Sequence, residues 1–143
     1  MGRRIEEALI PARFLTTLGH FLAVLILAGS KATVVNAGLA GGQPSADDIA
    51  AANSEVNGAL IFALFCFLLD FAGLGFGFSA FMPKVNALQI LVHFAGGVLT
   101  SRLVVEEWDY RVFWYIVAMC NVPAAIAELL VMALIFGLKV YSY

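Results

Sequence analysis

Residues 108–139 read WDYRVFWYIVAMCNVPAAIAELLVMALIFGLK, and this stretch indicates the class of the fold. Within it, 112–138 carries no charged side chain except that of Glu128. This length exceeds the roughly 20 residues that a helix needs to cross a hydrocarbon core of about 30 Å. Aromatic side chains at the membrane–water interface anchor such helices. We predict four of these anchors at the start of the stretch: Trp108, Tyr110, Trp114 and Tyr115.

The composition of the whole chain supports a membrane protein. Of the 143 residues, 62% are hydrophobic and only 13% are charged, against roughly 25% charged in soluble domains. A soluble domain of this size would have to expose much of that apolar surface to water, so the expected solvent is the lipid bilayer. The net charge of −2, without a basic patch, argues against a nucleic-acid partner.

Three further apolar segments complete an all-α membrane protein. We predict spans at about 11–28, 59–81, 85–105 and 112–138, which form one small four-helix membrane domain without a second domain. Short turns after the second and third spans predict that spans two, three and four pack as an antiparallel meander. The long loop 29–58 is predicted to be luminal or extracellular. It is expected to contain a short helix that begins after Ser45.

The distribution of Lys and Arg predicts the orientation in the membrane. An even number of spans places both termini on the same side. That side carries five basic residues: Arg3, Arg4, Arg13, Lys84 and Lys139. The other side carries three: Lys31, Arg102 and Arg111. The positive-inside rule therefore predicts that both termini are cytosolic.

Each predicted span carries one ionisable residue near its middle: His20, Asp70, His93 and Glu128. All four lie within about three residues of the centre of their span, or roughly 5 Å at 1.5 Å rise per residue. Small and polar residues precede or follow them at helical spacing, so these faces are expected to turn toward one another. We predict a polar cluster at the midplane of the bilayer.

Small and polar residues beside this cluster are predicted to let the helices approach. The predicted packing residues are Gly73, Gly77, Gly96 and Asn121, and Gly73 with Gly77 forms a G-x-x-x-G pattern. Pro123 predicts a kink in the last span, where Asn121 would help to satisfy the freed backbone groups.

Two imidazoles and two carboxylates at one depth admit three interpretations. They can serve as interhelical hydrogen bonds that fix the packing of the bundle. They also match a Zn²⁺ ligand set, although the usual sequence spacing of paired ligands is absent. A proton or ion path is the third interpretation, because such paths use His and acidic side chains. The pattern predicts no catalytic residue and no cofactor.

With these residues in view, the chain resembles the transmembrane protein 107 family of the ciliary transition zone. The N-terminal part of the resemblance consists of Met1-Gly2-Arg3, the stretch Pro11-Ala12-Arg13-Phe14-Leu15-Thr16 and His20. Asp70 and His93 continue it in the middle of the chain. The C-terminal part consists of Glu106, Trp108, Trp114-Tyr115-Ile116, Cys120, Pro123, Glu128 and Phe136-Gly137-Leu138-Lys139.

This resemblance implies a four-span, non-enzymatic membrane protein with cytosolic termini. It implies a place in the complex that gates the base of the cilium, with other transition-zone membrane proteins as partners. Effects on ciliary membrane composition and ciliogenesis would follow. The alternative is a small transporter or metal-binding membrane protein that uses His20, Asp70, His93 and Glu128.

Overall fold

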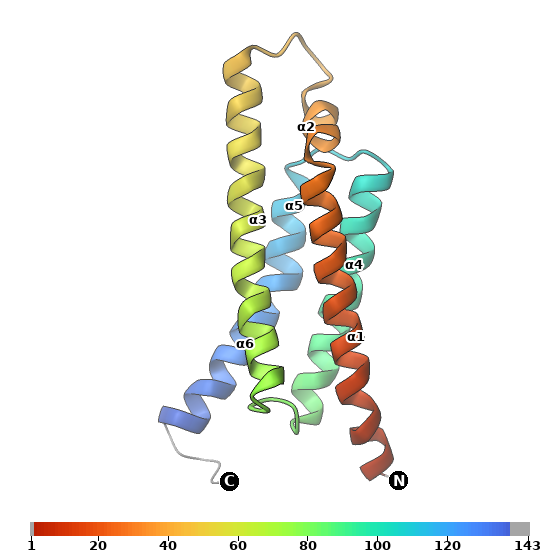
Figure 1. Cartoon of the computed structure of the whole chain (residues 1–143), viewed down its shortest axis with the longest axis vertical. Coiled ribbons are helices and arrows are strands. Elements are labelled where there is room, and N and C mark those ends of the chain that lie inside the picture. The colour runs from red at the N-terminus through yellow and green to blue at the C-terminus, as the bar shows by residue number, and fades with distance from the viewer. Residues whose placement is uncertain (1, 138–143) are drawn as a thin grey trace.

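The computed structural model describes residues 2–137, with side chains from Ala8 onward, and all of its long elements are helices (Figure 1). The elements in chain order are α1 (Gly2–Gly29), α2 (Lys31–Leu39), α3 (Ala46–Gly75), α4 (Pro83–Val105), α5 (Val112–Ile116), the π-helical η1 (Val117–Asn121), α6 (Val122–Met132) and the π-helical η2 (Ala133–Gly137). Within the described residues, four helices are long and apolar enough to cross a membrane: Ala8–Gly29, Ala46–Gly75, Pro83–Val105 and Val112–Gly137. The predicted all-α fold with four long apolar helices is confirmed.

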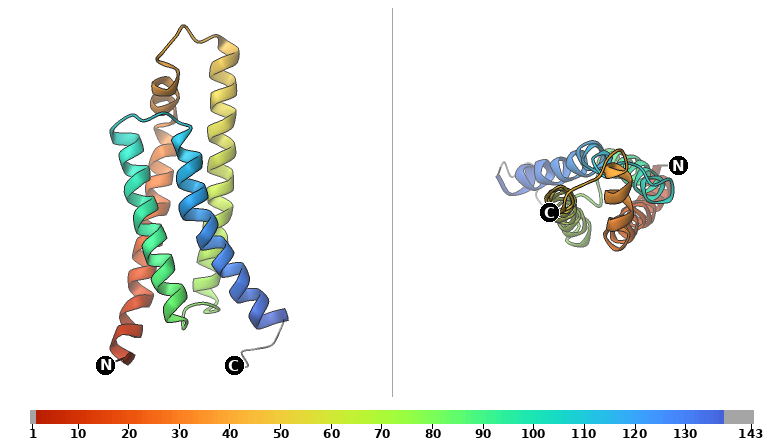
Figure 2. Two further views of the ribbon diagram at one scale, coloured as in Figure 1. Left: turned by 180° about the vertical axis from the view of Figure 1, so that it is seen from behind. Right: turned by 90° about the horizontal axis from the view of Figure 1, so that it is seen from above.

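The helices form an elongated bundle in which α1 lies along α4 and α3 lies along α6 (Figures 1 and 2). The start of α1 and the end of η2 lie at the same end of the bundle (Figure 1). The predicted meander is wrong, because α3 and α4 occupy opposite corners when the bundle is viewed from above (Figure 2). The reason is the turn: α3 ends at Gly75, so residues 76–82 are free to cross the bundle before α4 begins.

The first loop is much shorter than predicted. Ser45 caps α3 as expected: its hydroxyl accepts from the amide of Asp48, and the Asp48 carboxylate accepts from the amide of Ser45. The helix then continues to Gly75 instead of ending within 29–58, and α2 occupies part of the same predicted loop. Alanines favour this continuation, and one face of the early part of α3, at Ala52 and Val56, is buried.

Two other boundaries differ from the prediction. Pro11 lies inside α1 rather than in its first turn, since α1 begins at Gly2. Gly77 lies in the turn after α3 with a φ of +76°, a conformation that glycine adopts without steric cost. It therefore belongs to the turn and not to a helix-packing G-x-x-x-G. The predicted end of the last span, Leu138, and Lys139 lie outside the described residues.

The fourth candidate membrane span, Val112–Gly137, which we call the last crossing, is irregular around Pro123. The π-helical turn Val117–Asn121 precedes the proline, and the amide of Val122 donates to the carbonyl oxygen of Val117. Since proline supplies no N–H, a helix must rearrange its hydrogen bonds nearby. Beyond this point α6 and η2 lean away from the other helices (Figure 2).

The buried interior is divided along the bundle axis. The apolar core lies toward the α2 end, where Leu27 of α1, Val34 of α2, Ala59 of α3 and Phe113 of α5 are buried together. Most buried polar residues lie toward the end where α1 begins: Arg13, Thr17, His20, Asp70, Ser79, Asn86, Gln89, His93 and Glu128. Thr100, in the last part of α4, and Asn121, in η1, are buried as well.

Candidate functional site: two buried polar clusters

The four ionisable residues predicted for the midplane are buried, but they form two clusters instead of one. His20, Asp70 and His93 lie together; we call them the histidine cluster. Glu128 lies in a second group, the Arg13–Glu128 cluster, which comprises Arg13, Ser79, Asn86, Gln89 and Glu128. Within the described part of the chain, no hydrogen bond joins the two clusters.

The Arg13–Glu128 cluster is an ion pair surrounded by neutral hydrogen-bonding groups. Arg13 donates from Nη2 to Glu128 Oε1 at 2.5 Å, and the side chains are 1% and 0% exposed. Its other terminal nitrogen, Nη1, donates to Ser79 Oγ at 2.7 Å and to Asn86 Oδ1 at 2.9 Å. Glu128 Oε1 also accepts from Ser79 Oγ at 2.8 Å and from Gln89 Nε2 at 3.1 Å. The cluster thus joins α1, the 76–82 turn, α4 and α6.

Glu128 can approach α3 closely because Gly73 has no side chain. A Cβ atom there would overlap the carboxyl group of Glu128. Asn86 further fixes the turn, since its Nδ2 donates to the carbonyl oxygen of Ala80 at 2.6 Å. Asn121, the other predicted packing residue of the last crossing, is fully buried, but no side-chain hydrogen bond is formed by it within the described residues.

The sequence prediction missed Arg13 as a site residue because it assigned this side chain to the start of the first span. Arg13 stands seven residues before His20, which is the spacing that places two residues on one helix face. Thr17 and Val24 continue the same buried face. This periodicity was the available signal for an inward-facing arginine. The separation of Arg13 from His20 is about 10 Å along the helix axis, which explains why the two clusters are distinct.

The histidine cluster is a row of three side chains from three helices. His20 Nδ1 and His93 Nδ1 lie 3.2 Å apart, and His93 Nε2 lies 3.3 Å from Asp70 Oδ2. Phe67 packs against both rings, with centroid distances of 4.9 Å to His20 and 5.7 Å to His93. A Cβ atom at Gly96 would overlap the ring of His20, so this glycine sets the position of the imidazole.

The row has a consistent protonation pattern. Asp70 favours the His93 tautomer that carries its proton on Nε2, because that proton faces the carboxylate. His93 then accepts through Nδ1, and His20 donates from its own Nδ1. His20 Nε2, His93 Nε2 and both carboxylate oxygens of Asp70 have no hydrogen-bond partner among the described residues, so His93 and Asp70 interact through their 3.3 Å electrostatic contact alone.

The four residues are not arranged as the zinc interpretation requires. No group of three or more His, Cys, Asp or Glu side chains within the described residues is placed to hold a metal ion. The physical reason is that Glu128 is engaged by Arg13, which leaves a single carboxylate beside the two imidazoles.

The aromatic residues at the start of the last crossing have different surroundings. Trp114 and Tyr115 are 37% and 71% exposed, and Trp108 is half-buried while its Nε1 donates to Glu106 Oε2 at 2.9 Å. Tyr110 differs from the predicted interfacial anchor, since it is only 4% exposed. Its ring packs where a Cβ atom at Gly38 would clash, so it joins α2 to the bundle.

Comparison with known proteins places this architecture in a family. The TMEM107 family model, described as a transmembrane protein, matches residues 9–132. The proteins named transmembrane protein 107 from Rattus norvegicus and Mus musculus are each 31% identical over 142 residues, which covers 97% of both chains. The Homo sapiens protein of that name is 30% identical with the same coverage. No solved structure matches the chain. The chain belongs to the transmembrane protein 107 family.

Proposed function

We propose that this protein is a non-enzymatic membrane subunit of the ciliary transition zone, where it helps assemble the gate complex and so controls ciliary membrane composition and ciliogenesis. The observation that carries the proposal is the use of the buried charges for packing. Glu128, the acid deepest in the last crossing, is bonded to Arg13, Ser79 and Gln89 from three other parts of the chain. Such a carboxylate supports assembly of the bundle, since Oε1 accepts hydrogen bonds from three parts of the chain, while Oε2 is buried without a hydrogen-bond partner among the described residues.

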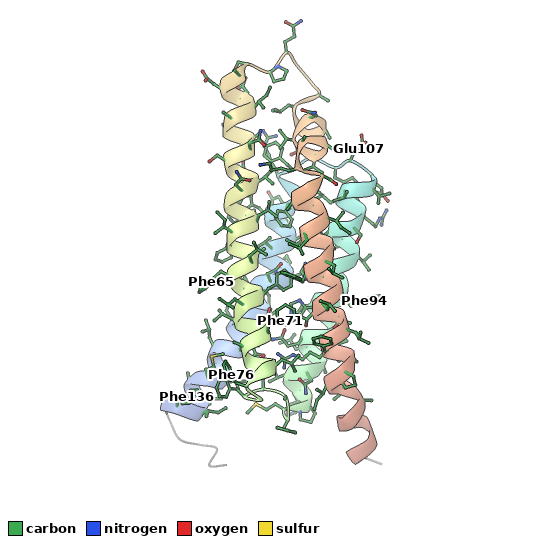
Figure 3. The ribbon with its side chains drawn as sticks, in the orientation of Figure 1. Phe65, Phe71, Phe76, Phe94, Glu107 and Phe136 are labelled. Carbon is green, nitrogen blue, oxygen red and sulfur yellow. The ribbon has the colours of Figure 1, made fainter. Side chains whose placement is uncertain are left out.

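The outer surface of the bundle supports an assembly role as well. Large apolar side chains project outward from every crossing, and Phe65 on α3 and Phe94 on α4 are 56% and 63% exposed (Figure 3). In a membrane these faces contact lipid or the helices of other membrane proteins. The partners that fit the proposal are the other transition-zone membrane proteins.

We also propose that both termini are cytosolic. Arg13 is buried in the Arg13–Glu128 cluster, so it no longer counts as a loop charge. Four basic residues remain on the terminal side (Arg3, Arg4, Lys84 and Lys139), against Lys31, Arg102 and Arg111 on the other. The remaining asymmetry has the same sign. Protease treatment of sealed vesicles should digest tags at both ends, and a protected tag at either end would refute this orientation.

The decisive functional experiment is rescue of cells that lack the protein. Asp70→Asn keeps a carbonyl oxygen opposite His93 Nε2 but removes the charge, whereas Asp70→Leu removes the acceptor. If the cluster serves packing, Asp70→Asn should restore cilium formation and the placement of partner proteins, because single interhelical bonds contribute only about 0.6–2 kcal/mol. Asp70→Leu should lower abundance and rescue together.

A transport function predicts a different order. An amide does not carry a proton, so Asp70→Asn would then fail to rescue although the protein is present at normal abundance at the ciliary base. That combination would overturn the assembly proposal. The control is Phe65→Leu on the same helix, which alters an exposed apolar side chain and should rescue fully.

A further inference from the structure

A groove of about 480 Å³ runs along the outer side of the contact between α1 and α4. Leu15 and Gly19 line it from α1, and Phe94, Gly97, Ser101 and Arg102 line it from α4. Its volume falls in the range of about 300–1,000 Å³ that small-molecule sites occupy. The groove opens toward the surroundings of the bundle, so in a membrane its natural occupant is a lipid.

The floor of the groove is flat because glycine lines both helices. A Cβ atom at Gly19 would meet nothing within 4 Å, so the space above this residue is open. On α4, a Cβ atom at Gly97 would lie 3.3 Å from the Cα atom of His20, which shows how closely the two backbones approach. Leu15 and Phe94 form raised apolar walls at 65% and 63% exposure, and Figure 3 places Phe94 at the outer edge of this helix pair.

The exposed polar groups of the lining gather at one end of the groove, because His20 and His93, which also line it, are 0% exposed. Ser101 and Arg102 lie in the last turns of α4, which ends at Val105. The guanidinium of Arg102 is paired with Glu106 at 2.8 Å, so this end presents hydrogen-bonding groups whose charges are balanced. At the opposite end of the groove the hydroxyl of Thr16 is already used, since it donates to the carbonyl oxygens of Ala12 and Arg13.

These features match one class of membrane lipid. The ligand should carry a small uncharged head, because a phosphate would compete with Glu106 for Arg102. Its body should be rigid and flat, since a flexible acyl chain loses more conformational freedom on a flat floor than a rigid ring system does. The rise from Phe94 to Arg102 is about 12 Å, which suits fused rings with a hydroxyl at one end.

We propose that the groove between α1 and α4 binds a membrane sterol, with its hydroxyl at Ser101 and Arg102 and its rings over Gly19 and Gly97. The proposal is independent of a ciliary role, because binding is measured on the isolated protein.

The test uses the full chain in phosphatidylcholine nanodiscs and a cholesterol probe that carries a ring diazirine and a tail alkyne. Light should attach the probe to residues 15–19 and 94–102, and unlabelled cholesterol should compete. Gly19→Leu extends a side chain into the groove from a Cβ position that meets nothing within 4 Å. It should lower labelling about tenfold, the factor expected when a ligand loses about 1.4 kcal/mol of binding free energy. Gly29→Leu is the matched control, since a Cβ atom there also meets nothing within 4 Å and Gly29 does not line the groove. It should label like the native protein.

Each alternative occupant gives its own result. Equal labelling of Gly19→Leu and the native protein would overturn the proposal, as would attachment outside the two lining segments. A diazirine phosphatidylcholine probe that labels the same residues with the same dependence on Gly19 would assign the groove to an acyl chain. A cysteine crosslink between two copies at position 15 that is insensitive to cholesterol would assign it to a second copy of the chain.

Discussion

Removing one partner of the Arg13–Glu128 pair should destabilise the protein far more than removing both. Arg13→Leu leaves a carboxylate that is 0% exposed with only the neutral donors Ser79 and Gln89. Loss of one partner of a buried ion pair costs about 3–5 kcal/mol. Glu128→Leu strands the guanidinium in the same way and should cost a similar amount.

The double variant Arg13→Leu/Glu128→Leu removes both charges. Apolar replacement of a complete buried ion pair is often close to neutral in free energy. Ser79 and Asn86 lose their contacts with the guanidinium, and an unsatisfied buried polar group costs about 1–3 kcal/mol. We therefore expect the double variant to lose about 1–3 kcal/mol, so the two substitutions are coupled by several kcal/mol.

The measurement is the free energy of unfolding of each variant by steric trapping in bicelles. Leu15→Ala on the same helix is the control, because this side chain is 65% exposed and its truncation should change the free energy of unfolding by no more than about 0.5 kcal/mol. If the costs of the single substitutions simply add in the double variant, Arg13 and Glu128 do not interact and the ion-pair reasoning is refuted.

Two other substitutions test local packing. Gly96→Ala places a methyl group against the ring of His20 and should cost about 1–3 kcal/mol, measured as the free energy of unfolding; an equal effect of Gly19→Ala, where the space is open, would contradict this. Ser45→Ala removes the hydroxyl that accepts from Asp48 N and should speed hydrogen exchange at the first amides of α3, while unchanged protection there would show that the cap does not hold this end.

The sequence predicted which helix faces point into the bundle, but it did not predict which side chains pair between helices. Helical spacing identified Asp70, His93 and Glu128 as buried, because a charged side chain in an apolar helix turns away from lipid. Which side chains pair across the bundle depends on how far each helix is shifted along the bundle axis relative to its neighbours. The spacing of residues within one helix carries no information about this shift. Arg13 illustrates the difference: its spacing to His20 was visible, but only the tertiary structure brings Glu128 to it.

The predicted helix ends were wrong where they rested on one or two residues alone. Ser45 was correctly interpreted as a cap, yet the length of α3 depends on its burial against neighbouring helices, which a cap does not report. Gly77 had the spacing of a packing residue and serves the turn instead. A glycine is compatible with either role, and only the position of the helix end decides between them.

The pairing of Arg13 with Glu128 also imposes an order in time during synthesis. The two residues are 115 positions apart, and a ribosome that adds about 5–20 residues per second needs roughly 6–23 s to make the intervening chain. During that interval α1 holds a guanidinium for which no carboxylate partner yet exists, so the long side chain must extend toward the nearer membrane surface. It withdraws into the bundle only when α6 arrives. A nascent or truncated chain that ends before Glu128 therefore lacks the carboxylate that pairs with Arg13 in the finished protein.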